Sequence, residues 1–530
     1  MEKQNKMAIL GMVLLVFLLL SATVLLYPVQ AAMPYKQAGL TEQQAALHLL
    51  NRFTFGPRPG DVEKTLQMGL ENWLEQQLKI QLPESKLNAK LQEYPVLSMK
   101  TMEIINIYPD NGNVVAEAKR EGFIPKEGIA DPVELKRKIA EFETIKGYRP
   151  QQELINALNE QKILRALYSE NQLAEVMTDF WFNHFNVSIT QNRARPYVLS
   201  YERDGIRPHA IGQFSSLLQA TAIHPAMLYY LDNAESIAPP KPVQGGKGIS
   251  RKLGGINENY ARELLELHTL GVDGGYSQFD VEETARIFTG WTVLPRGANE
   301  RAEIIANSQS GKNHDVMTDD GYWFRKNYHD AGEKHVLGYV LAEDSPQDGK
   351  DLLNVLANHP STAYHISYKF ARRFDSDNPP QALVGRLTKA FMDSGGDTKA
   401  LVRALTQSKE FWDEAKQPTK IKTSLEFVVS ALRSGNAEVT DVKAVLSWIN
   451  RMGHPLYSCL PPTGYPDQGD FWLNSGTLFT RVNYSFALAY GSIRGVGLDE
   501  GINNTKKDSA GTDRRYQQGL LWSGPEFQMH

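Results

Sequence analysis

The sequence predicts a mainly α protein: one large multi-helix domain, residues 33–530, with short β-hairpins or extended arms and long loops. Apolar residues recur at helical spacing over long stretches, most clearly in 151–233 and 349–412. Helix start signals accompany this spacing, as where Thr41 is followed three residues later by Gln44, a capping-box pattern. The contents of 42% hydrophobic and 22% charged residues are ordinary for a globular protein.

The N-terminus has the order of an export signal. Lys3 and Lys6 precede an apolar run over residues 7–26, and small residues follow around Ala31. We therefore expect residues 1–32 to be a signal peptide and the mature protein to be periplasmic or secreted. The run is also about as long as a membrane-spanning helix requires, so an uncleaved N-terminal anchor stays open as the one contact with a membrane.

Charge and cysteine content exclude several classes of function. The net charge of −4 gives no electrostatic reason to expect a nucleic-acid partner. The single cysteine, Cys459, excludes an intrachain disulfide and a CxxC metal site. An HExxH zinc helix and a GxSxG nucleophile elbow are both missing from the sequence.

Two segments differ in composition from the helical stretches. Residues 79–150 are more polar, which predicts a variable helical excursion. Residues 238–255 are rich in proline and glycine and carry Lys241 and Lys247, which predicts a mobile loop. Because this loop leads into a helix start, it either closes over an anion bound there or is a plain flexible connection.

A polar helix followed by a glycine-rich turn lies at the centre of the chain. The helix is predicted from Asn257 to Gly271, and at 100° per residue its polar side chains share an arc roughly 100° wide. These side chains are Asn259, Arg262, Glu263 and Glu266. Apolar flanks, which include Trp291, indicate burial, so the polar row is either a structural network or a site. As a site, Glu263 and Glu266 would transfer protons, and Asn259, Arg262 and Trp291 would contact the substrate.

Three histidines are candidate metal ligands. His184 follows Asp179 and Asn183 within an aromatic segment, His268 lies near the end of the central helix, and His329 precedes Asp330 in a predicted hairpin or arm. These histidines, together with Glu263 and Asp330, would suit a divalent metal such as zinc, iron or manganese. Asp330 is also a candidate catalytic carboxylate. His268 would contribute only if the last helical turn loosens before Gly271. The alternatives are buried structural histidines and a surface turn in which Asp330 is a cap.

Several motifs carry a family resemblance. They are LHLLNRFTFGPRP, DFWFNHFNVSI, HPAMLYYLDN, the segment 257–291, NYHDAGEKHVLG, PPTGYPDQGDFWLNSGTL and LLWSGPEFQ. Over roughly residues 40–530 the chain resembles the bacterial domain-of-unknown-function 1800 family. The resemblance implies no established activity. It implies one expected partner, because members of this family are often encoded beside an exported sulfatase-like companion protein.

The sequence leaves three functions open. One is a metal-assisted or acid–base hydrolase acting on an extracytoplasmic substrate. We expect aromatic loops such as 454–480 to line a cleft, and such loops would suit a sugar-like or polymeric substrate. The second is a non-catalytic scaffold or assembly protein of the cell envelope. The third is a redox protein with histidine-ligated iron, although no CxxCH haem attachment is present.

Overall fold

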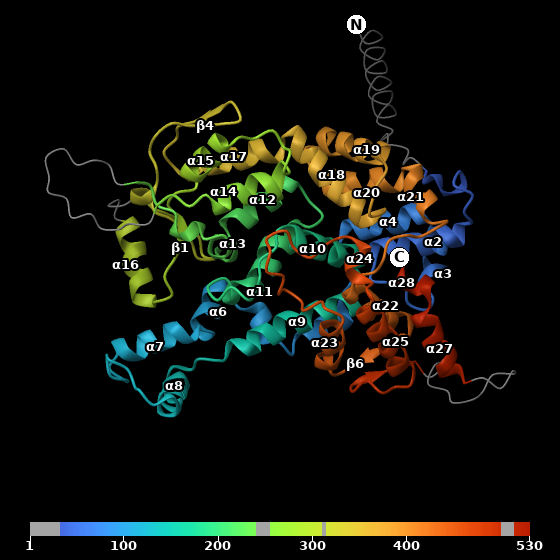
Figure 1. The fold of residues 1–530 in the computed structure, drawn as a ribbon, viewed down its shortest axis with the longest axis horizontal. Helices are drawn as coiled ribbons and strands as arrows, with labels where there is room; N and C mark the ends of the chain where they lie inside the picture. The colour runs from blue at the N-terminus through green and yellow to red at the C-terminus, as the bar shows by residue number, and fades with distance from the viewer. Residues whose placement is uncertain (1–31, 240–254, 310–313, 500–512) are drawn as a thin grey trace, which may run out of the picture.

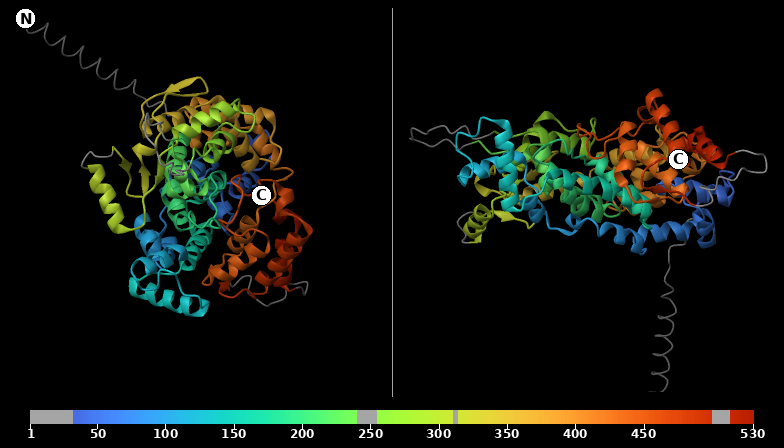
Figure 2. Two further views of the ribbon diagram at one scale, coloured as in Figure 1. Left: turned by 60° about the vertical axis from the view of Figure 1, so that its left-hand side comes forward. Right: turned by 90° about the horizontal axis from the view of Figure 1, so that it is seen from below.

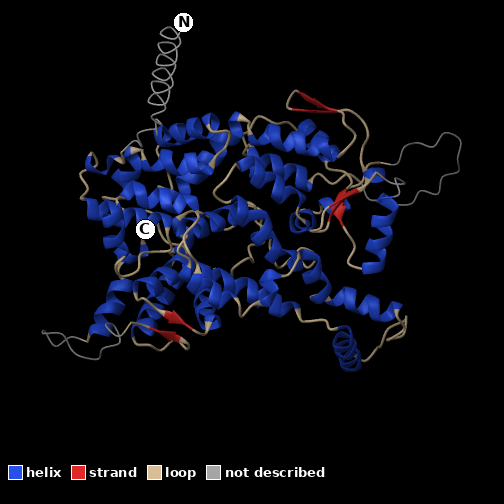
Figure 3. Cartoon of the chain, turned by 180° about the vertical axis from the view of Figure 1, so that it is seen from behind, coloured by secondary structure: helices blue, strands red, loops and turns tan. Residues whose placement is uncertain are grey.

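The computed structural model describes residues 32–239, 255–309, 314–499 and 513–530. Nearly all of the predicted export segment (1–31) and most of the predicted mobile loop (240–254) lie outside the described residues. Helices dominate the described chain and strands are few and short (Figure 3), which confirms the mainly α class. No helix in the described ranges is long and apolar enough to cross a membrane.

The first third of the chain is a run of helices that ends at His184. They are α2 (Glu42–Phe53), α3 (Asp61–Met68), α4 (Leu70–Lys79), α5 (Ser85–Leu91), α6 (Thr101–Ile107), α7 (Asn111–Arg120), α8 (Pro132–Lys146), α9 (Gln151–Tyr168) and α10 (Gln172–His184). The predicted capping box is present at the start of α2. The Gln44 N–H donates to Thr41 Oγ1 at 3.2 Å, and the Thr41 N–H donates to Gln44 Oε1 at 2.9 Å.

Helices α7 and α8 form a small body at one edge of the molecule, blue to cyan in Figures 1 and 2. Their apolar side chains pack together in a cluster made of Val114, Ala118, Ile124 and Phe142. The main core consists of other residues, from Met33 to Trp522. The two helices belong to residues 79–150, the predicted excursion, and they have a hydrophobic core of their own.

The middle of the chain contains two π-helical segments. Its helices are α11 (Val198–Ser200), the π-helix η4 (Tyr201–Ile206), α12 (Phe214–Ile223), α13 (Pro225–Tyr230), α14 (Asn259–Glu263), the π-helix η7 (Leu264–Thr269), α15 (Gln278–Ile287), α16 (Ala298–Gln309), α17 (Pro346–Ala357) and α18 (Pro360–Phe374). π-Helical turns are rare and are frequent at functional sites. Both segments here contribute a buried polar side chain to a cluster described below.

The predicted regular helix over residues 257–271 is wrong in its second half. Asn257 Oδ1 accepts from the Asn259 N–H at 2.8 Å, so the start of the helix is as expected within two residues. From Leu264 the helix is a π-helix, and the Thr269 hydroxyl donates to the Leu264 carbonyl at 2.6 Å. Gly271 then has φ = 86°, the left-handed conformation that favours glycine at a helix end.

The last part of the chain packs as further helices against the first. They are α19 (Gln381–Asp393), α20 (Thr398–Thr406), α21 (Lys409–Glu414), α22 (Ser424–Ser434), α23 (Val442–Arg451), α24 (Gly469–Trp472), α25 (Ser475–Ala489), α27 (Arg514–Ser523) and α28 (Pro525–Gln528). Long-range bonds join them to the N-terminal helices: Arg433 Nε donates to the Gly56 carbonyl at 2.6 Å, and Arg52 pairs with Glu414 at 3.3 Å.

The strands form three small antiparallel sheets within the described ranges. One has the order β1 (Trp291–Val293), β3 (Tyr322–Phe324), β2 (Val316–Met317), and Trp291 pairs with Phe324. The predicted hairpin follows as β4 (Lys334–Val336) and β5 (Tyr339–Leu341). The third sheet joins β6 (Glu438–Val439) to β7 (Val496–Gly497).

Candidate active site

A cavity of about 60 Å³, lined by several polar side chains, lies between α9, α10, the start of α22 and residues 454–472. Side chains from segments far apart in the sequence line it, among them Lys162, Asp179, His454, Tyr457, Tyr465 and Trp472. The prediction that residues 454–480 form a loop that lines a cleft is therefore confirmed in part: residues between His454 and Trp472 line the cavity, but 469–472 form α24 and α25 begins at Ser475. Because one water needs roughly 10–15 Å³ of such space, the cavity holds a few waters or one small polar group.

The C-terminal end of α10 fixes the loop over this cavity. Asn183 bonds both sides of the Tyr465 peptide: its Nδ2 donates to the Tyr465 carbonyl at 2.9 Å, and its Oδ1 accepts from the Tyr465 N–H at 2.7 Å. Asn186 Nδ2 donates to the carbonyls of Cys459 and Pro461 at 3.0 and 2.9 Å. A Cβ on Gly464, which has φ = 75°, would lie 2.2 Å from the Asn183 carbonyl oxygen. The close contact between loop and helix thus requires glycine at this position.

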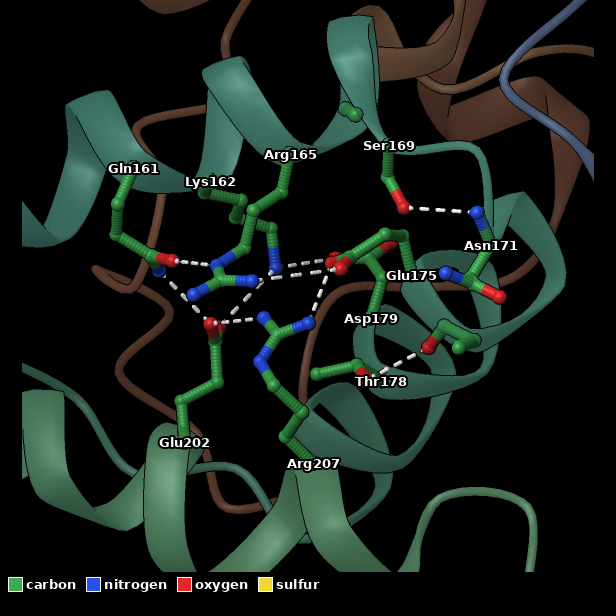
Figure 4. Close-up of polar contacts among 12 residues, drawn as sticks. Gln161, Lys162, Arg165, Ser169, Asn171, Glu175, Thr178, Asp179, Glu202 and Arg207 are labelled. Carbon is green, nitrogen blue, oxygen red and sulfur yellow. Dashed lines mark hydrogen bonds and ion pairs between the residues drawn. The ribbon is translucent and has the colours of Figure 1, made fainter. Parts of the chain in front are cut away.

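A network of buried charges underlies the cavity (Figure 4). Lys162 from α9 pairs with Asp179 of α10 at 2.6 Å and approaches Glu202 of η4 at 3.7 Å. Arg207 bridges Glu202 at 2.8 Å and Glu175 at 2.5 Å. Each of these charges has an opposite partner, as buried charges require. The network connects three helical segments and fixes the position of the Asp179 carboxylate.

Glu202 is the most deeply buried acid of this network, with its side chain 1% exposed. Burial alone would raise its pKa, but Lys162 and Arg207 outweigh that effect and lower the pKa to about 2. The Tyr457 hydroxyl donates to Glu202 at 2.5 Å, and the Lys162 ammonium lies 4.9 Å from the centre of the Tyr457 ring. Asp179 differs from Glu202 because its side chain is 25% exposed and faces the cavity.

His454 stands between two aromatic rings in the cavity wall. Its ring centre is 4.7 Å from that of Tyr465 and 4.5 Å from that of Trp472. Burial lowers the pKa of His454 to about 4, so the imidazole is neutral at neutral pH. The Leu425 N–H donates to Nδ1 at 3.4 Å, which favours the tautomer with the proton on Nε2. Within the described chain, Nε2 has no hydrogen-bond partner.

The cavity therefore combines a carboxylate with a neutral imidazole that can donate a hydrogen bond. The charge of Asp179 counteracts part of the lowering of the His454 pKa, so the two groups interact electrostatically. An ionised carboxylate can accept a proton from water, and a neutral Nε2–H can donate to an oxygen that develops negative charge. The arrangement can carry out acid–base chemistry on a small polar group.

The polar row predicted on the central helix lies on a half-exposed face. Burial, and then the neighbouring Glu266, raise the pKa of Glu263, and Glu266 Oε2 accepts from the Tyr276 hydroxyl at 3.3 Å. Arg262 pairs with Glu258 at 3.2 Å. Asn259 Nδ2 donates to the Leu231 carbonyl at 3.4 Å. Except for Glu263, these side chains are held by local partners.

Two other predicted site residues occupy positions that do not suit their predicted roles. Trp291 is fully buried and packs edge-on against Phe288 and Tyr322, so its ring is part of the core and has no surface to offer a substrate. Asp330 makes a two-pronged pair with Arg286 at 3.0 and 3.1 Å. Although burial opposes it, this guanidinium lowers the pKa of Asp330, which disfavours a role as a proton carrier.

The structure brings together two of the three predicted metal ligands. The rings of His184 and His268 are 6.2 Å apart, and His365, which the sequence did not indicate, is the third member of this cluster at 6.3 Å from His184. His329 lies elsewhere: its Nδ1 is 2.9 Å from the Thr289 carbonyl and its Nε2 is 3.2 Å from the Lys334 ammonium. The predicted triad is therefore not assembled.

The environment of the His184–His268–His365 cluster is also unfavourable for a cation. Burial, and then the positive charge of Lys369, lower the pKa of all three imidazoles. His184 Nε2 is 3.1 Å from the His268 carbonyl, which is a structural contact. In the described ranges, no group of three or more His, Cys, Asp or Glu side chains is placed to hold a metal ion.

The residues that carry the cavity chemistry were only partly visible in the sequence. Asp179 and Asn183 stand out there as a polar pair among aromatic residues, and the loop 454–480 stands out by its proline, glycine and aromatic content. His454 gives no such signal, since nothing in its local sequence indicates that it faces Asp179.

Comparison with known proteins gives a family and no function. No curated protein and no solved structure matches the chain. The sequence does match the family described as "Protein of unknown function (DUF1800)" over residues 48–524, nearly the whole chain and including every residue of the cavity named above. The resemblance seen in the motifs is thereby confirmed, and the chain belongs to the DUF1800 family.

Proposed function

We propose that this chain is an exported acid–base hydrolase that acts from the cavity between α9, α10 and the loop 454–472. The observation that carries the proposal is the pairing of a cavity-facing carboxylate, Asp179, with a buried neutral imidazole, His454, in one small polar space. Perturbed titratable groups in a concave site are the usual mark of catalysis. Export rests on the basic and apolar order of residues 1–32 alone.

The residues suggest a direct displacement by water. Asp179 accepts a proton from a water molecule as the water oxygen forms a bond to the electrophilic carbon of the substrate. The carbon–oxygen bond to the leaving group breaks while the neutral His454 donates a hydrogen bond from Nε2–H to that oxygen. The proton taken up by Asp179 then passes through solvent to the leaving oxygen, which restores the carboxylate and leaves His454 neutral throughout. Lys162, at 2.6 Å, holds the Asp179 side chain in place.

The size of the cavity limits the part of the substrate that enters it. A space of about 60 Å³ takes a single small group and excludes the body of a polymer. The ring of Tyr465 stands 4.7 Å from that of His454 and offers a flat apolar surface next to polar groups, whereas Trp472 is buried. Such a surface suits a sugar-like unit, so we propose that a small substituent of a sugar-like substrate enters the cavity while the sugar ring stays at its rim.

A metal-assisted version of the same reaction is less well supported. It would require His184, His268 and His329 to share one ion, whereas His329 contacts Lys334 and the other two lie beside Lys369. A second metal ligand set is not evident in the described residues. The proposal therefore uses only Asp179 and His454.

A panel of 4-nitrophenyl glycosides and esters tests the proposal. We expect wild-type protein that lacks residues 1–32 to hydrolyse at least one of them. Asp179→Asn and His454→Gln should each reduce the rate by about 10²-fold or more with an unchanged circular dichroism spectrum. Asp413→Asn, a change of an exposed acid on α21, serves as the matched control. Hydrolysis that survives in Asp179→Asn, or no hydrolysis of any panel member by wild type, would refute the proposal.

A second function, a scaffold or assembly protein of the cell envelope, is favoured by a different observation. Large apolar side chains are exposed in and just after the cavity loop: Leu460 and Phe479 are 70% exposed, and Phe471, beside Trp472, is 46% exposed. Exposed apolar patches mark interaction sites. Co-purification with the sulfatase-like companion protein tests this. Loss of the companion from the Phe471→Ser/Phe479→Ser double variant would support it, and equal recovery with wild type would contradict it.

A further inference from the structure

A second hollow, of about 560 Å³, lies on the other side of α9 from the C-terminal helices, between the α7–α8 body and the main body. Its lining comes from residues 105–120, Tyr148, residues 193–197, Tyr229 and residues 294–300. Its volume is within the range of small-ligand sites, which occur preferentially where two bodies meet. Because the α7–α8 body has its own apolar cluster, the hollow lies where two bodies meet.

Three guanidinium groups and three carboxylates, those of Asp110, Glu117 and Glu300, line this hollow. Arg120, Arg193 and Arg296 line it, and Arg301 stands behind Arg296. Arg301 donates to the Pro295 carbonyl at 3.2 Å and to Asn106 Oδ1 at 3.4 Å. Neither Arg120 nor Arg301 pairs with a carboxylate in the described part of the chain. Although the charges that line the hollow balance in number, the Arg120 guanidinium is left available to an external anion.

The other arginines are only partly compensated. Arg296 approaches Glu117 at 3.9 Å, but that carboxylate also accepts from the Tyr148 hydroxyl at 2.8 Å and lies 3.8 Å from Lys146. Arg193 pairs with Glu235, which lies outside the lining of the hollow. Burial, and repulsion from Arg296, lower the pKa of Arg301, although Tyr197 raises it. An anion placed among these groups would relieve their mutual repulsion.

Tyrosine rings and carboxylates complete the lining. Arg193 lies over the ring of Tyr229 at 4.4 Å and Arg296 over the ring of Tyr148 at 4.6 Å, so the guanidinium planes are held by stacking. Asp110 and Glu300 also line the hollow and offer acceptors for hydroxyl groups. Fixed guanidinium groups bind carboxylate or sulfate with two hydrogen bonds each, and nearby acceptors bind polyol hydroxyls.

We propose that this hollow binds an acidic sugar, that is, a pyranose unit or short oligosaccharide bearing a carboxylate or sulfate group. The anionic group sits among Arg120, Arg193 and Arg296, and the ring hydroxyls face Asp110 and Glu300. This site is separate from the cavity that contains Asp179. It does not rest on the proposed hydrolysis, since binding here needs none of the residues assigned to that reaction.

Isothermal titration calorimetry with the full chain lacking residues 1–32 tests the proposal. The probes are trigalacturonate, which carries carboxylates, a sulfated chondroitin disaccharide, and neutral maltotriose. We expect at least one anionic probe to bind at millimolar concentration or below and maltotriose to bind at least about tenfold more weakly, because the charge-assisted hydrogen bonds are lost. Which anionic probe binds more tightly distinguishes a carboxylate from a sulfate ligand.

Charge variants locate the binding. Arg120→Gln and Arg193→Gln, whose side chains are exposed or half-exposed, should each weaken the anionic probe about tenfold without unfolding the protein. Arg137→Gln on α8 is the matched control: it removes an equal charge from the same small body, at a side chain that is 64% exposed and does not line the hollow. No binding of either anionic probe, equal binding of maltotriose, or equal weakening by Arg137→Gln would overturn the proposal.

Discussion

Replacing Glu202 with glutamine should destabilise the protein in a manner that depends on pH. Glu202 accepts from Arg207 at 2.8 Å, from Gln161 at 2.8 Å and from Tyr457 at 2.5 Å. These partners and Lys162 outweigh the effect of burial and hold its pKa at about 2, against an ordinary value of 4.5. A shift of about 2.5 pKa units corresponds to roughly 3 kcal/mol of unfolding free energy.

The sign of the pH dependence follows from the lowered pKa. A carboxyl group whose pKa is lower in the folded state stabilises that state fully above its unfolded pKa of 4.5 and loses the effect as the pH falls towards 2. Glutamine has the shape of the protonated acid without its ionisation. We expect Glu202→Gln to cost about 3 kcal/mol at pH 7 and only about 1 kcal/mol at pH 3.

Urea unfolding followed by circular dichroism at the two pH values measures this difference. The matched control is Glu438→Gln, which removes ion pairs with Lys86 at 2.8 Å and Lys90 at 2.5 Å from a side chain that is 49% exposed. The control should cost no more than about 1 kcal/mol because water screens an exposed pair. A loss for Glu202→Gln below that of the control at pH 7, or a loss of equal size at both pH values, would refute the reasoning.

Four further outcomes are expected. A reporter enzyme fused after Ala32 should be active outside the cytoplasm, and activity only in the cytosol would contradict export. His184→Ala should leave the metal content of the purified protein unchanged and lower its melting temperature, since Lys369 beside the cluster disfavours a cation; loss of a stoichiometric metal would reverse that conclusion. Burial lowers the pKa of Lys422 to about 7, so below pH 10 its charge destabilises the folded state; Lys422→Met should therefore be more stable than wild type at pH 7, with the gap closing as the pH rises to 10, as measured by thermal melts. Gly464→Ala should shift the cavity loop and raise its rate of proteolysis, because the added Cβ would lie 2.2 Å from the Asn183 carbonyl; an unchanged rate would show that the loop can adapt.

The local features of the fold were predictable because they depend on neighbours in sequence. The capping box at Thr41 and Gln44 needs only two residues three apart, and the left-handed Gly271 follows from the end of an apolar pattern. The cavity loop was recognisable because proline, glycine and aromatic residues gather in 454–480. In each case the physical cause lies within a few residues of the feature.

The pairing of distant groups was not predictable in the same way. Asp179 lines the same cavity as His454, 275 residues further along the chain, and His329 contacts Lys334 rather than joining His184. Helical periodicity says which face of a helix is polar, but it does not say which other helix covers that face. The fully buried Trp291 is a further example. An aromatic residue at the end of a polar segment is equally compatible with a binding surface and with the core, and the sequence does not distinguish them.

The two π-helices explain why α-helical periodicity does not predict the contacts of Glu202 and Thr269. Residues five apart differ by roughly 140° on a regular α-helix, so a sequence scan places Glu202 and Arg207 on different faces. Glu202 lies in the π-helix η4 and Arg207 directly follows its last residue, and the wider turn of this helix brings the two side chains into an ion pair at 2.8 Å. The same spacing brings the Thr269 hydroxyl to the Leu264 carbonyl in η7, the segment that carries His268. The ion pair of Glu202 with Arg207 and the hydrogen bond of Thr269 are therefore set by a five-residue spacing that the 100° periodicity of an α-helix does not predict.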